Sequence, residues 1–73
     1  MLEELAREIV QSKNRNKIVN EIEWYLNGHY EKSRFFALLM VNGIYKQEYD
    51  KIIEELTNRD LLLKLYELIQ KYH

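Results

Sequence analysis

The chain contains two glycines and no proline, and both glycines lie in the same short pattern, Asn-Gly-x-Tyr. The pattern occurs as Asn27-Gly28-His29-Tyr30 and, fifteen residues later, as Asn42-Gly43-Ile44-Tyr45. Glycine adopts the left-handed backbone conformation without steric cost, and a residue in that conformation commonly ends a helix. Gly28 and Gly43, set in a background of helix-forming residues, therefore predict short helices joined by tight turns.

Apolar residues recur at helical spacing in five segments, and each apolar stripe lies opposite charged residues. The predicted helices cover about Leu2–Gln11, Arg15–Leu26, Tyr30–Val41, Lys46–Thr57 and Leu61–Tyr72, with Asp60 as the N-terminal cap of the last one. The sequence therefore predicts an all-α fold: a compact bundle of four to five short helices that forms a single helical domain over residues 1–73.

The segment Phe35–Val41 is apolar at all seven positions. A helix that is apolar on every side has to be buried on every side, so helix 30–41 is predicted to be the central element of the bundle. A buried strand is the competing interpretation. Val41 is the only β-branched residue of the segment, however, and its alanine, leucine and methionine residues favour a helix.

The composition is typical of a soluble globular protein, with 47% apolar and 32% charged residues. Eleven Lys and Arg against twelve Asp and Glu give a formal charge of -1, which predicts no general attraction to nucleic acid or anionic membranes. The longest apolar run is far shorter than the roughly 20 residues of a membrane span, and the first residues do not resemble a secretory signal. We therefore expect a cytoplasmic protein with no membrane partner.

No arrangement of residues predicts catalysis or a bound cofactor. The absence of cysteine excludes disulfides, thiolate metal ligands and thiol nucleophiles. The two histidines, His29 and His73, have no second histidine at helical spacing, and the carboxylate pair Glu4 and Glu8 lies on a polar helix face. Two glycines so far apart cannot form a phosphate-binding loop. We expect a non-enzyme without metal, cofactor or small-molecule substrate.

Basic residues gather near two predicted helix starts and suggest nucleic-acid binding as an alternative function. If these two starts lie close together, their positive charges and backbone amides could contact phosphates. Trp24 or Tyr30 would then be available to stack on a base. The candidate contact residues are Lys13, Arg15, Lys17, Lys32 and Arg34.

The segment Phe36–Leu56 has the outline of a helix-turn-helix. Its second helix would present mainly acidic side chains outward, which phosphates would repel, so we do not expect it to serve as a recognition helix. The sequence Gly-Ile-x-x-x-Glu-Tyr at 43–49 resembles the short helical hairpins of the SHOCT type. That resemblance implies a helical hairpin and no particular activity.

The apolar surplus of the chain predicts a protein–protein interface. The last predicted helix has a wider leucine-rich face than one neighbouring helix needs, and aromatic side chains are enriched at interfaces. We therefore expect a small helical interaction module that forms a homo-oligomer or serves as an accessory or regulatory subunit of a larger complex. The candidate interface residues are Leu61, Leu62, Leu65, Leu68, Tyr72 and Trp24.

Overall fold

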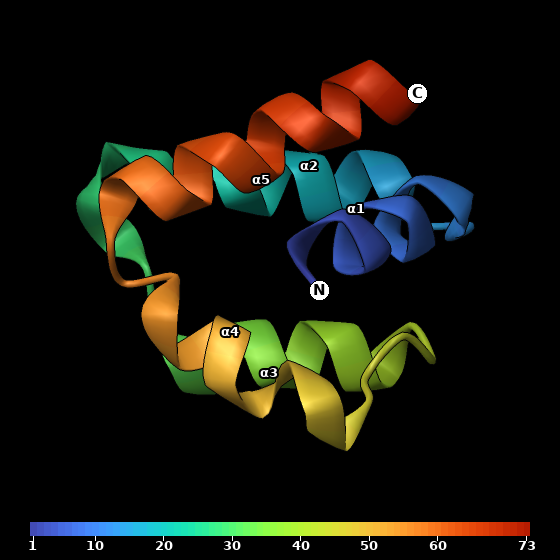
Figure 1. Cartoon of the computed structure of the whole chain (residues 1–73), viewed down its shortest axis with the longest axis horizontal. Coiled ribbons are helices and arrows are strands. Elements are labelled where there is room, and N and C mark those ends of the chain that lie inside the picture. Colours follow the sequence, from blue (N-terminus) through green and yellow to red (C-terminus); the bar gives the residue numbers. More distant parts are fainter.

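The fold is built from helices alone, and the computed structural model describes all 73 residues. The α-helices are α1 (Leu2–Gln11), α2 (Arg15–Trp24), α3 (Lys32–Val41), α4 (Asp50–Glu55) and α5 (Arg59–Tyr72). A π-helical turn, η1 (Tyr25–His29), follows α2, and a 3₁₀ turn, η2 (Gln47–Tyr49), leads into α4. Figure 1 shows two layers, with α1, α2 and α5 in one and the α3–α4 hairpin in the other. The predicted all-α bundle of short helices is confirmed.

The first and last helices form the most extensive pairing in the molecule. Each has an apolar stripe at i, i+3, i+4 or i+7 spacing that points into the common core: Leu2, Leu5, Ala6 and Ile9 on α1, and Leu62, Leu65 and Ile69 on α5. Burial of these stripes removes apolar surface from water, which is the main favourable term in folding. The buried core contains 16 residues, and none of them is charged. No helix has the combined length and apolar character that crossing a membrane would require.

Helix α3 differs from the prediction in its environment. Phe35 and Leu39 are fully buried, but Met40 is 60% exposed and Val41 is 83% exposed, so the expected enclosure of residues 35–41 on every side is wrong. The reason is the two-layer architecture. α3 packs against the core on one side and beside the six-residue α4 on another, and no further helix remains to cover its outer face.

Both glycines adopt positive φ angles, as predicted: +97° at Gly28 and +69° at Gly43. At the end of α3 the Gly43 amide donates to the Met40 carbonyl at 3.1 Å, and the Ile44 amide donates to the Leu39 carbonyl at 2.9 Å. This pair of bonds is the Schellman motif, and the side chain that follows the glycine, Ile44, is buried as that motif favours.

Replacing Gly43 with alanine should destabilise the protein through backbone strain alone. A Cβ added at Gly43 would meet no other atom within 4 Å, so steric contact with neighbours contributes nothing. The left-handed conformation costs a non-glycine residue about 1 to 2 kcal/mol, and we expect that decrease in the free energy of unfolding in urea titrations. Gly43→Asn should lose less, because asparagine tolerates this conformation better than alanine.

Two helix boundaries in the second half differ from the prediction. Lys46 has an extended backbone, and η2 precedes a shorter α4, so the predicted helix 46–57 begins late. The last helix begins at Arg59 because the Asn58 side chain, rather than Asp60, caps it by accepting a 2.9 Å hydrogen bond from the Asp60 amide.

Candidate functional site

Helices α2 and α3 belong to different layers and run in opposite directions (Figure 1). At one end both carboxylate oxygens of Glu21 accept hydrogen bonds from the Arg34 guanidinium, at 3.2 and 3.3 Å. At the other end the Asn14 side-chain amide donates to the Asn42 carbonyl oxygen at 2.5 Å. The second contact joins the start of α2 to the end of α3, which both lie on the right in Figure 1.

A groove of about 270 Å³ lies between these two contacts. Its apolar part comes from α3, through Ala37, Leu38 and Val41, and its polar part includes Lys17 of α2. Ala37, Met40 and Val41 are at i, i+3 and i+4, so they share the solvent-facing stripe of α3. The groove therefore opens onto an apolar strip that no part of this chain covers.

Trp24 extends this surface at the end of α2. The side chain is 41% exposed, and its ring lies 5.0 Å from the Arg34 guanidinium carbon, which is a cation–π contact. The His29 imidazole stacks on Trp24 with centroids 4.8 Å apart and planes 14° from parallel. His29 follows Gly28, where an apolar side chain would have packed back on the helix, and stacking on Trp24 takes that role. Together Lys17, Trp24, Ala37, Met40 and Val41 define what we call the α2–α3 face.

The ion pair at the end of the groove affects the titration of its neighbours. The hydrogen bond from Arg34 to Glu21 raises the pKa of the guanidinium, which therefore stays charged. The nearby Tyr25 hydroxyl is buried without a hydrogen-bond partner. Burial first, and then the negative charge of Glu21, raises the pKa of this hydroxyl, so Tyr25 is neutral at physiological pH. One end of the groove is thus formed by the Arg34–Glu21 ion pair, whose two charges cancel.

Of the predicted nucleic-acid residues, the structure brings only Lys17 and Arg34 to the same groove. The antiparallel arrangement places the starts of α2 and α3 at opposite ends of the groove, which contradicts the proximity on which that prediction depended. Lys32 pairs with Glu54 at 2.8 Å and Arg34 pairs with Glu21, so both cations are neutralised within the chain.

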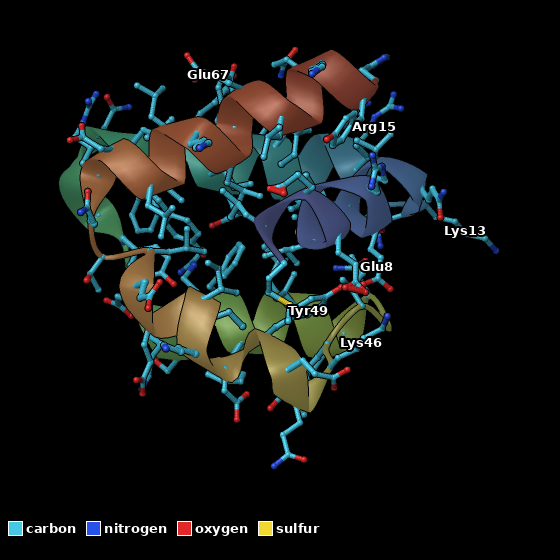
Figure 2. All side chains as sticks on the ribbon, viewed as in Figure 1. Glu8, Lys13, Arg15, Lys46, Tyr49 and Glu67 are labelled. Carbon is cyan, nitrogen blue, oxygen red and sulfur yellow. The ribbon has the colours of Figure 1, made fainter.

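The basic residues at the start of α2 are not paired with carboxylates. Lys13, Arg15 and Lys17 form no ion pair. Figure 2 shows Lys13 extending into solvent at the turn between α1 and α2. Arg15 is half-buried, and its Nε atom has no hydrogen-bond partner.

Most of the predicted α5 interface is used inside the molecule. Leu62 and Leu65 are buried in the core, which contradicts their assignment to an exposed interface, because their stripe packs against α1. Leu61, Leu68 and Tyr72 are half-buried against the same core. Trp24 is the one predicted interface residue that is largely exposed. The sequence does not predict Met40 and Val41 as surface residues, because an apolar run without periodicity is assigned wholly to the core.

A second polar cluster joins α1 to the segment before α4 (Figure 2). The Lys46 ammonium lies 3.8 Å from Glu4 and 3.5 Å from Glu8, and the Tyr49 hydroxyl donates to Glu8. Burial, and next the bond to Glu8, raises the pKa of Tyr49, so its hydroxyl remains a donor. Glu4 and Glu8, expected on a solvated face, thus serve as structural partners between layers.

No other part of the molecule has the features of a chemical site. A pocket of about 190 Å³ near Gly28 is smaller than the roughly 300–1,000 Å³ of ordinary ligand sites. Two hollows of about 310 and 380 Å³ are lined mainly by polar and charged side chains, whereas ligand sites are mostly apolar. No three His, Cys, Asp or Glu side chains are placed to hold a metal ion. No protein-family model, curated protein or solved structure matches this chain. The α2–α3 face is therefore the best candidate for a functional surface.

Proposed function

We propose that this chain is a protein-interaction module that docks through the α2–α3 face. The observation that carries this proposal is the exposure of apolar side chains on α2 and α3: Trp24, Met40 and Val41 are three of the four large apolar residues that the fold leaves exposed. Exposed apolar patches commonly mark interfaces, and tryptophan, methionine and arginine are enriched in them.

The rigidity of Trp24 supports the same proposal. Its ring is already held by His29 and Arg34, so binding would restrict the side chain little further. Ordering a flexible side chain at an interface costs about 0.5 to 1.5 kcal/mol. A partner that covers Trp24 therefore gains contact area at a low cost in conformational entropy.

Val41→Glu is expected to remove association through this face while leaving the fold intact. The change places a charge in the apolar strip, where a docked partner would have to desolvate it. Substitutions at exposed positions usually change the free energy of unfolding by less than about 0.5 kcal/mol, and Val41 is 83% exposed. Binding should fall at least tenfold in light scattering, for self-association, and in quantitative affinity purification from cells, for partners.

The matched control is Gln70→Glu, which adds the same charge at an exposed position of α5. It should leave both measurements as in the unmodified protein. A protein that neither self-associates nor retains any partner sensitive to Val41→Glu would contradict the proposed function.

The nucleic-acid alternative has weaker support. Two of its five predicted cations are neutralised, and only Lys13, Arg15 and Lys17 remain unpaired, at one end of the molecule. Phosphate binding would depend steeply on salt concentration. An electrophoretic mobility assay at low salt separates the two functions, because a lack of retardation removes this alternative.

A further inference from the structure

The α2–α3 groove runs along an exposed apolar face of α3 on which a helix could lie. Lys17 and Glu21 on α2 are one turn apart, and Arg34, Leu38 and Val41 on α3 span two turns of the facing wall. From residue 34 to residue 42 the wall is about 12 Å long at 1.5 Å per residue. An amphipathic helix that lays its apolar face into such a trough is a recurrent mode of peptide recognition.

The charge of the groove is not balanced within the chain. Both oxygens of Glu21 are occupied by Arg34, so this pair contributes no free charge. Lys17, which lies one turn from Glu21 on the same face of α2, forms no ion pair. The α2 wall therefore presents uncompensated positive charge beside the apolar strip.

A second copy of this chain is a poor occupant for this groove. The exposed apolar helix that a copy could offer is α3, and α3 contains no aspartate or glutamate. Inserting it would bring no carboxylate to Lys17, because α3 has none and its Lys32 and Arg34 are already paired within the copy. The positive charge of Lys17 would therefore stay uncompensated.

We propose that the α2–α3 face receives an acidic amphipathic helix from a different protein, whose apolar side chains cover Ala37, Met40 and Val41 and whose carboxylate pairs with Lys17. This inference rests on the proposed function of the face. It adds the chemical class of the partner: a helix with a glutamate or aspartate on one edge of its apolar stripe. The binding should weaken as salt concentration rises, because the charge pair lies at the rim of the groove.

The test uses a displayed library of amphipathic helical peptides with leucine and isoleucine fixed on one face. The flanking positions vary among glutamate, glutamine and lysine, and peptides are selected for binding to the full chain. Enriched peptides should carry glutamate at one edge position, and replacing it with glutamine should weaken binding about tenfold. Lys17→Gln should weaken the same peptide equally, and Lys17→Glu should restore binding to the lysine form of that peptide. Lys64→Gln, at an exposed unpaired lysine on α5, is the control and should change nothing.

The outcomes distinguish this inference from the proposed function. Peptides that bind in a Val41-dependent way without preferring glutamate would overturn the acidic partner while leaving the interaction face in place. A Val41-dependent dimer of the chain would do the same. Selected peptides that all bind equally well to Val41→Glu, from a chain that stays monomeric, would overturn both.

Discussion

Replacing Leu65 with alanine is expected to lower the free energy of unfolding by about 2 to 5 kcal/mol, the range for buried leucine truncations. Leu65 has no exposed surface, and its stripe on α5 packs against α1. A single core of this size rarely supplies more than about 3 to 5 kcal/mol in total, so much of the variant should be unfolded at room temperature. Circular dichroism during urea titration measures the loss.

Leu63→Ala is the matched control, because it removes the same atoms from the same helix. Leu63 is half-buried and lies outside the packed core, so its truncation should cost much less. Nearly equal, small losses for the two variants would contradict the burial of α5. Such losses would indicate instead that the leucines of α5 form an exposed interface.

The amphipathic character of α5 could be predicted because it is a local pattern, although the assignment of Leu62 and Leu65 to an interface was wrong. Leu62, Leu65 and Ile69 repeat at helical spacing, and any partner helix would have to cover them. The same holds for the turn at Gly43, where one residue and its neighbour Ile44 specify the geometry. Local backbone chemistry thus determined the number and type of the helices.

The exposed strip of α3 could not be predicted, because it depends on which elements remain to cover each side. All positions of 35–41 are apolar, so periodicity could not separate Phe35 and Leu39 from Met40 and Val41. The pairing of Lys32 with Glu54 joins residues 22 positions apart, and that of Arg34 with Glu21 joins residues 13 apart. Such ion pairs depend on how the helices pack against one another, and the pattern of neighbouring residues in the sequence does not predict that packing.

The late start of α4 has a similar long-range cause. Tyr49 lies buried with its hydroxyl donating to Glu8, 41 positions earlier in the chain. An uninterrupted helix from Lys46 would follow propensity, but the extended backbone at Lys46 accompanies the contacts of Lys46 and Tyr49 with α1. Tertiary packing overrides helix propensity at this point.

At alkaline pH the protein is expected to lose stability steeply, and Tyr49→Phe should reduce that loss. Burial and the bond to Glu8 raise the pKa of Tyr49 well above the ordinary value of about 10 for tyrosine. Below pH 10 the stabilisation is fully present. Between pH 10 and the folded pKa the unfolded chain holds fewer protons, so the free energy of unfolding falls by about 1.4 kcal/mol per pH unit for this tyrosine.

Urea titrations across the alkaline range should therefore give a slope against pH that is shallower in Tyr49→Phe by about that amount. Tyr30 is also shifted upward by burial, but it is present in both proteins and cancels in the difference. At neutral pH the variant should lose only about 0.5 to 1.5 kcal/mol, the net value of one hydrogen bond.

Tyr66→Phe provides the comparison at the surface. The Tyr66 hydroxyl donates to Glu23 at 2.7 Å, and this bond raises the pKa of Tyr66 at an exposed site. Water and salt can replace that contact, so the slope of stability against pH should change less than in Tyr49→Phe. Equal slopes in the two variants would mean that Tyr49 is as accessible as Tyr66. The α3–α4 hairpin would then not be packed against α1. In that case the inner side of α3 would not be covered, and its outer strip could no longer be singled out as the docking surface.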